Sequence, residues 1–357
     1  MEELRLNETP IRTSKNFNIN NIKLENVTIP DVISSFNNVS IDCNNDNIEI
    51  TNNVSKAELV YGISKNFSEM LNENANQNIK VEIKSNSSEE NDIAKIEFDF
   101  NKENMNLLDN IEIEAQENSK ANIIIKYKSL DDVEYFHNGI IRLIAKKNAE
   151  INVVLINFLN TKSHNFISIQ NNFENNSKVK YTIVDFGGKN SITNYYSNLL
   201  GDSSENVLNT IYLGKEEQLL DLNYMGELRG KKSIINIDVQ GALKDNARKH
   251  FKGTIDFKKG SKKSKGDENE FCMLLSDKAR SLALPMLLCS EEDVEGNHAS
   301  SAGKVGEKEL FYIMSRGFSF KEAMKLVVRA RFNNIISSLD DEDLKEEILS
   351  EIDNRLD

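Results

Sequence analysis

The sequence predicts a mainly β protein, with a β-solenoid core between a mixed, partly helical N-terminal segment and a small C-terminal helical domain. Three observations lead to this fold class. Short runs of alternating apolar and polar residues fill the middle of the chain, a faint repeat of about 30 residues punctuates them, and helical periodicity replaces them near the C-terminus. The predicted domains are 1–90, 91–303 and 304–357.

The N-terminal segment is the least regular part of the chain. It is rich in Asn, Asp, Glu and Ser, and its amphipathic stretch 54–71 predicts short helices. Its first residues lack the apolar region of a signal peptide, and no stretch of the chain approaches the roughly 18 apolar residues of a membrane span. We therefore expect a cytoplasmic protein that does not enter a membrane.

The predicted solenoid is most legible from Ala94 to about Phe257, where runs such as AKIEFDF, ANIIIKYK and EINVVLINFL alternate with polar turns. Asn118, Asn148 and Asn176 each begin an Asn-small-charged turn before a strand, 30 and 28 residues apart. Repeats of this size indicate stacked units that are too small to bury their own apolar faces. No helical stretch separates the strands, which excludes an α/β sheet, whereas a β-sandwich stays open.

The pattern of apolar and polar residues changes after Asp267. Residues 270–290 still resemble strand segments, with Pro285 at an edge or a turn. A helix is predicted over 307–316, with Leu310, Ile313 and Met314 on one face, and Gly317 ends it.

Two more helices are predicted at the C-terminus. Ser319 and Glu322 form a capping box at the start of the first. The apolar positions that recur at helical spacing in these two helices are Met324, Val328, Phe332, Ile335, Ile336 and Leu339, then Leu344, Ile348, Ile352 and Leu356. We therefore expect each helix to bury one apolar face.

Charge and cysteine content exclude several classes of partner. The net charge of −13 argues against binding to nucleic acid or to anionic lipid. The basic run 248–265 is interpreted as a solvated loop, with an anion-binding patch as the alternative. The three cysteines include no C-x-x-C pair, so reduced thiols are expected rather than a disulfide framework or a Cys-rich zinc site.

Two imitations of catalytic motifs are rejected. The segment 226–233 resembles a phosphate-binding loop, but it departs from that motif at two positions. Only three residues separate Gly226 from Gly230, and Lys232 stands where the motif requires a hydroxyl side chain. We therefore expect a turn here and no nucleotide bound to this chain. Acid pairs such as Asp131 and Asp132 are expected on the solvated surface. A carbohydrate-active β-helix enzyme would use an acidic cluster, and this class stays a remote alternative because nothing singles out a pair.

His298 is the sharpest candidate for a site, because it stands among Gly, Ala and Ser residues. An isolated histidine in a turn is more often structural than a ligand. Cys289, nine residues upstream, follows apolar residues and is interpreted as a buried strand thiol, which leaves His298 without a partner in its own chain. If His298 binds a metal, we expect another chain to supply the remaining ligands.

A second candidate is the aromatic segment ELFYIMSRGFSF. Aromatic and arginine side chains dominate protein interfaces, and this segment concentrates them: Phe311, Tyr312, Arg316, Phe318 and Phe320. Packing against the end of the solenoid would use Phe311 and Phe318 equally well. Partner binding and core packing therefore both stay open from the residues alone.

The stretch from about Ala247 to Phe332 resembles the SUF-system iron–sulfur scaffold family, SufB/SufD. The matching pieces are ARKHFKGTIDF, LLSDKARSLALPMLL, DVEGNHASSAGKVGEKELFYIMSRG and the following helix, and a looser likeness extends over 94–245. This resemblance implies a right-handed parallel β-helix. It also implies that two members pair through their β-helices and that each C-terminal helical domain docks a SufC ATPase subunit.

The resemblance further implies that His298 belongs to a transient iron–sulfur cluster site shared with a SufB-like paralogue. SufB has a cysteine six positions before the proline and a glutamate after the histidine, whereas this chain has Ala279 and Ala299 there. Many SufD sequences read Cys-Ser-His-Gly where this one reads Gly-Asn-His-Ala. The chain therefore resembles SufD, with that pattern only partly kept.

The expected function is that of a scaffold that hydrolyses nothing itself. Closing of SufC around ATP is expected to pull on the helices around Tyr312 and Arg316, to rearrange the β-helix interface and to expose His298. A neutral imidazole is a competent iron ligand, but clusters generally require several thiolates, which implies a site completed by another chain. A homodimeric scaffold that works without SufB is the alternative.

Overall fold

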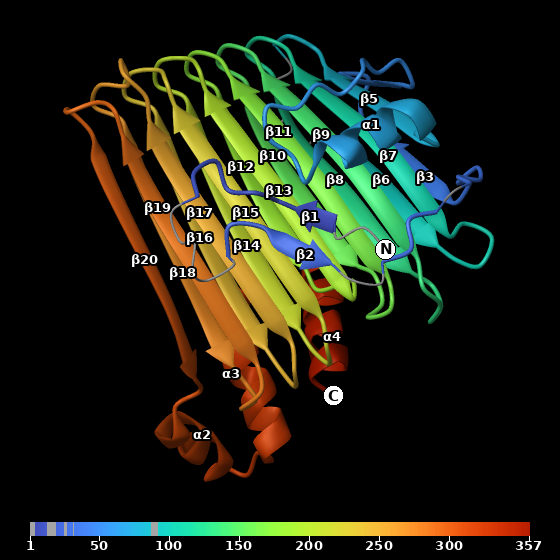
Figure 1. The fold of residues 1–357 in the computed structure, drawn as a ribbon, viewed down its shortest axis with the longest axis vertical. Helices are drawn as coiled ribbons and strands as arrows, with labels where there is room; N and C mark the ends of the chain where they lie inside the picture. The colour runs from blue at the N-terminus through green and yellow to red at the C-terminus, as the bar shows by residue number, and fades with distance from the viewer. Residues whose placement is uncertain (1–3, 13–18, 25–26, 31, 87–91) are drawn as a thin grey trace.

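The computed structural model describes residues 4–12, 19–24, 27–30, 32–86 and 92–357. Its core is a β-solenoid of about eight turns, in which the chain passes alternately through two nine-stranded sheets (Figure 1). Sheet 1 consists of β3 (Val39–Cys43), β6 (Ile93–Phe100), β8 (Lys120–Ser129), β10 (Glu150–Phe158), β12 (Lys178–Asp185), β14 (Glu205–Gly214), β16 (Ile234–Leu243), β18 (Lys265–Leu274) and β20 (Glu295–Lys304). Sheet 2 consists of β4 (Ile48–Thr51), β5 (Gln77–Ile83), β7 (Asn106–Ala115), β9 (Phe136–Ala145), β11 (His164–Phe173), β13 (Asn190–Leu199), β15 (Leu219–Leu228), β17 (Arg248–Phe257) and β19 (Arg280–Cys289).

The predicted solenoid is confirmed. Only β3 and β4 pair antiparallel with their neighbours in these two sheets, and every later ladder is parallel. A β-sandwich is built from antiparallel sheets, so that alternative is wrong. The predicted boundary between 90 and 91 lies outside the described residues, and β5 already belongs to the parallel part of sheet 2.

The faint asparagine repeat marks one corner of each turn of the solenoid. Asn118, Asn148 and Asn176 have φ angles of 57°, 59° and 58°, in the left-handed region that asparagine tolerates better than most residues. Their side-chain amides form a ladder, with Asn148 donating to Asn118 at 2.8 Å and Asn176 donating to Asn148 at 3.2 Å. The spacing read from the sequence is therefore the length of one turn.

Part of the N-terminal segment lies on the outer face of sheet 2 (Figure 1). Its one α-helix among the described residues, α1 (Lys65–Asn74), confirms only the second half of the helical prediction for 54–71. Strands β1 (Leu4–Leu6) and β2 (Ile22–Leu24) form a small antiparallel pair. Asn7 follows β1 and donates a hydrogen bond to Asp221 of β15 at 2.6 Å, which ties the segment to the solenoid.

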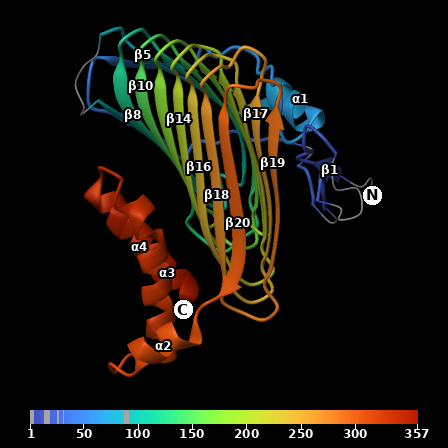
Figure 2. The same cartoon turned by 90° about the vertical axis from the view of Figure 1, so that its left-hand side faces the viewer.

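The three C-terminal helices, α2 (Glu307–Met314), α3 (Phe320–Ile336) and α4 (Glu342–Leu356), lie beside the outer face of sheet 1 (Figure 2). The predicted capping box of Ser319 and Glu322 is present. Of the ten predicted stripe positions, nine are buried and Met324 is partly buried, and they pack against apolar residues on the outer face of sheet 1, among them Ile156 and Val184. Met314 is 41% exposed, so its predicted place on the buried face of α2 is wrong.

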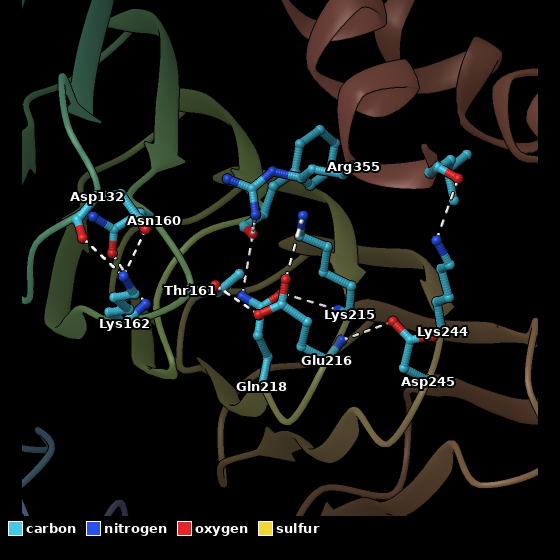
Figure 3. Close-up of polar contacts among 12 residues, drawn as sticks. Asp132, Asn160, Thr161, Lys162, Lys215, Glu216, Gln218, Lys244, Asp245 and Arg355 are labelled. Carbon is cyan, nitrogen blue, oxygen red and sulfur yellow. Dashed lines mark hydrogen bonds and ion pairs between the residues drawn. The ribbon is translucent and has the colours of Figure 1, made fainter.

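Polar contacts fasten the last helix to the turns of the solenoid (Figure 3). Arg355 of α4 is buried and donates hydrogen bonds to the carbonyls of Phe186 and Leu159, the latter at 3.1 Å. Lys244 donates to the carbonyl of Leu356 at 3.3 Å. Each of these contacts joins α4 to a turn between strands, so hydrogen bonds as well as apolar packing hold the helix against the solenoid.

The strands correct the prediction for the basic run 248–265 and confirm the one for Pro285. The basic run 248–265 is not one solvated loop, because its first ten residues form β17 and only 258–264 connect it to β18. Lys249 and Lys252 are fully buried in ion pairs with Glu270 and Asp221, each at 2.7 Å or less. Pro285 lies in β19, the edge strand of sheet 2, as predicted for a residue that cannot donate to a ladder.

No helix in the described part of the chain is both long enough and apolar enough to cross a lipid bilayer.

Candidate functional site

The solenoid ends in an open edge. β20 is the last strand of sheet 1 and β19 is the last strand of sheet 2, so each has a free side within the described chain (Figure 1). Nine of the ten residues of β20 are exposed. A long, exposed edge strand presents unpaired backbone groups to a second chain, and proteins that stay monomeric usually shield such edges.

His298 lies on this edge strand. The backbone around it is extended, since Glu295–Lys304 is one continuous strand. The imidazole is exposed and has no hydrogen-bond partner among the described residues. The ring is therefore not sealed within its own subunit, and it is free to contact a second chain.

The pairing of β20 with β18 shows which way the His298 side chain faces. His298 is the register partner of Glu268, with Asn297 beside Asp267 and Ser300 beside Glu270. Ser300 donates to the buried carboxylate of Glu270 at 2.7 Å, while Asn297 donates to Asp267 at 2.8 Å. Because side chains alternate between the faces of a strand, His298 shares the inner face with Ser300, at the mouth of the solenoid.

The interior directly beneath this mouth is polar. Glu270 is buried and accepts hydrogen bonds from the Lys249 ammonium at 2.7 Å, the Tyr212 hydroxyl at 3.1 Å and Ser300. Its charge is thus compensated by a buried cation and by two hydroxyl donors.

Glu268 differs sharply from Glu270. It is fully buried, and neither carboxyl oxygen has a hydrogen-bond partner among the described residues. Burial, followed by repulsion from Glu270, raises the pKa of Glu268 from 4.5 to about 8. The carboxyl group lies against the backbone of Gly253 on β17, where an added Cβ would come within 2.3 Å of the carboxyl carbon. Only glycine leaves room for the carboxyl in this position.

The cysteines do not complete a metal site in this chain. Cys289 is exposed at the end of β19, so the prediction of a buried thiol is wrong. Its Sγ donates to the carbonyl of Glu291 at 2.9 Å. Cys272 is buried on the inner face of β18. Within the described residues, no three His, Cys, Asp or Glu side chains gather as a metal-binding group.

The aromatic candidates form an exposed surface on α2 and the start of α3, here called the aromatic surface. Phe311 is 74% exposed, Tyr312 57% and Phe318 43%, so the alternative of packing against the end of the solenoid is wrong. Arg316 is also exposed, and its guanidinium lies over the Tyr312 ring, 4.6 Å from the ring centre. This surface lies beyond the carboxyl end of β20 (Figure 1), so the fold does not bring it together with His298.

Sequence reasoning missed the acidic residues beneath His298. Glu268 and Glu270 stand in a stretch that reads as an ordinary polar strand, and nothing in their local pattern marks them as buried. The repeat length could have placed them next to His298 and Ser300. Glu268 and Glu270 each lie 30 residues before their partners on β20, which is the length of one turn of the solenoid.

Comparisons with known proteins match a long central part of the chain. The family model described as "SUF system FeS cluster assembly, SufBD core domain" matches residues 98–331. The chain is 27% identical over 252 residues to the iron–sulfur cluster assembly protein SufD of Bacillus subtilis, which covers 70% of this chain and 58% of that protein. It is 23% identical over 246 residues to SufD of Escherichia coli, covering 68% of this chain and 58% of that protein. An iron–sulfur cluster assembly SufBD family protein of Pyrococcus horikoshii is 32% identical over 157 residues, covering 43% of this chain and 34% of its own length. The chain thus spans little more than half the length of the two SufD relatives.

Proposed function

The chain belongs to the SufBD core family of the SUF system, and we propose that it acts as a SufD-like scaffold that contributes His298 to an iron–sulfur cluster site shared with a second subunit. The observation that supports this proposal is the exposed imidazole of His298, which has no hydrogen-bond partner in the described part of the chain and lies on the inner face of an open edge strand. Imidazole suits iron, while clusters take most of their ligands from thiolates. The cluster is cargo, assembled at the site and passed on.

The open edge supports the proposed pairing of two solenoids. β19 and β20 each offer unpaired backbone groups to a strand from outside. In this proposal a SufB-like paralogue covers the edge and brings the thiolates that this chain lacks near His298. A homodimer is the second candidate, because the same edge can pair with its own copy about a two-fold axis.

The aromatic surface is the proposed docking site for a SufC-like ATPase. Its exposed Phe311, Tyr312 and Phe318 are large, rigid side chains of the kind that carry most of the binding energy of interfaces. Only two residues, Val305 and Gly306, separate β20 from α2. Movement of α2 by an ATPase would therefore pass directly to the strand that carries His298, while the chain itself hydrolyses nothing.

Replacing His298 by Ala tests the ligand role. In a complex reconstituted with the SufB-like and SufC-like subunits, the variant should leave subunit assembly intact and reduce cluster formation, followed by absorbance and by bound iron and sulfide. Asn297→Ala is the matched control, because Asn297 lies on the same strand with its side chain on the outer face. Undiminished cluster formation by His298→Ala in an intact complex would remove the ligand role.

Size-exclusion chromatography separates the two pairing schemes. The chain alone and mixed with the SufB-like paralogue should give a new species only in the mixture. A stable dimer of the chain alone that does not exchange with the paralogue would favour the homodimeric scaffold.

A further inference from the structure

We propose that Glu268 is a second ligand on this chain, so that its carboxylate and the His298 imidazole together bind one ferrous ion at the mouth of the solenoid. This inference rests on the proposed function, since it concerns the same open end and the same cargo. It adds an oxygen donor from inside the solenoid to the histidine on its edge, and it leaves the remaining coordination positions to groups outside the chain.

The strand register places the two side chains next to each other. His298 and Glu268 are direct partners on adjacent parallel strands, and their side chains share the inner face. Neighbouring strands lie roughly 4.8 Å apart. Both side chains are long enough for an imidazole nitrogen and a carboxylate oxygen to meet at one ion between them.

The state of Glu268 indicates a missing partner. Glu270, two residues on along the same strand, has three donors around its carboxylate, one of them the Lys249 ammonium. Glu268 is buried to the same degree and has no donor among the described residues. A buried carboxyl group without a hydrogen-bond donor is costly, and a bound cation would supply the missing partner of its carboxylate.

The surroundings of Glu268 provide space and suitable chemistry. Gly253 faces the carboxyl from the opposite sheet and leaves it room, and the mouth above it is lined by small residues, including Ser300 and Ala302 of β20. Carboxylate and imidazole are donors found together at non-haem ferrous sites. Two donors do not fill the coordination sphere of iron, so further ligands would come from a second chain or from the cargo.

Direct metal binding to the purified full-length chain tests this inference without any assay of cluster assembly. Fe²⁺ binding is measured by anaerobic equilibrium dialysis, and Co²⁺ serves as a spectroscopic probe of the donor set through its visible absorption. The dissociation constant should rise about tenfold or more in Glu268→Gln and in His298→Ala, because a lost ligand costs at least as much as a lost outer-shell contact. Asp267→Asn is the matched control, since that carboxylate neighbours Glu268 but faces outward. It should bind Fe²⁺ as the wild type does.

The outcomes distinguish this inference from the proposed function. If Glu268→Gln binds Fe²⁺ as tightly as the wild type while His298→Ala does not, Glu268 is no ligand, and the role of His298 stands. If Cys289→Ser weakens binding and Glu268→Gln does not, the second donor is the thiol, which also overturns the inference. Glu268→Asp keeps the carboxylate, and it serves as the test if circular dichroism shows that Glu268→Gln fails to fold. Its shorter side chain should weaken Fe²⁺ binding without abolishing it, whereas unchanged affinity would count against Glu268 as a ligand.

Discussion

Asp185, the last residue of β12, gives the stability of this protein a specific dependence on pH. Burial raises the pKa of its carboxyl from 3.8 to about 6, although Ser191 and Asn157 donate hydrogen bonds to it and the Arg355 charge lies near it. The folded chain therefore keeps this proton over a range of pH in which the unfolded chain has released it. The stability that results is fully present below about pH 4 and is lost as the pH rises through 6.

The magnitude follows from the difference between the two pKa values, 3.8 and about 6. Such a difference is worth about 3 kcal/mol, since each pKa unit corresponds to about 1.4 kcal/mol. Asp185→Asn removes the titrating group and therefore this loss of stability. The stability of the variant relative to the wild type should thus rise by about 2.5 kcal/mol between pH 4 and pH 7.5, because the unfolded carboxyl is already partly ionised at pH 4.

Urea unfolding followed by circular dichroism at a series of pH values measures this difference. Comparing the two proteins at each pH cancels the other titrating groups, and any constant cost of altering the hydrogen bonds to Ser191 and Asn157 shifts the curve without changing its slope. Asp132→Asn is the control, because the Asp132 side chain is 75% exposed and lacks the burial on which the reasoning depends. A flat difference for Asp185→Asn would refute the reasoning from burial.

Three further perturbations test other parts of the fold. Phe332→Ala should lower the free energy of unfolding by about 3–5 kcal/mol, because Phe332 is fully buried between α3 and sheet 1, and a loss below about 1 kcal/mol in urea unfolding would contradict this packing. Asn148→Ala should cost about 1–2 kcal/mol through its left-handed backbone, whereas Asn148→Gly should unfold close to the wild type, and equal losses in the two variants would exclude the backbone as the cause. Alanine at both Phe311 and Tyr312 should weaken capture by an immobilised SufC-like ATPase while leaving the unfolding midpoint nearly unchanged. The control Leu130→Ala alters an exposed residue of a solenoid turn and should leave capture intact. Equal capture of the double variant and the control would place the docking site elsewhere.

The features that depend on neighbouring residues along the chain were predictable. The asparagine turns were recognised because an Asn-small-charged pattern recurs with the length of one turn. The capping box of Ser319 and the buried stripe from Val328 to Leu356 were recognised because helix signals act over three or four residues. Caps, helical periodicity and turn residues act over a few neighbouring positions, so they can be recognised without the tertiary structure.

The character of the site depended on the tertiary structure. Nothing near Glu268 in the sequence shows that it is buried, unpartnered and placed beneath His298, because that contact joins residues 30 positions apart through the stacking of two turns. The exposure of Cys289 and the burial of Lys249 were mispredicted for the same reason, since burial in a solenoid is set by the next turn and by the opposite sheet. The amino-acid sequence by itself determined the solenoid, its repeat and its C-terminal helices, and the stacking of the last turns decided which side chains meet at its open end.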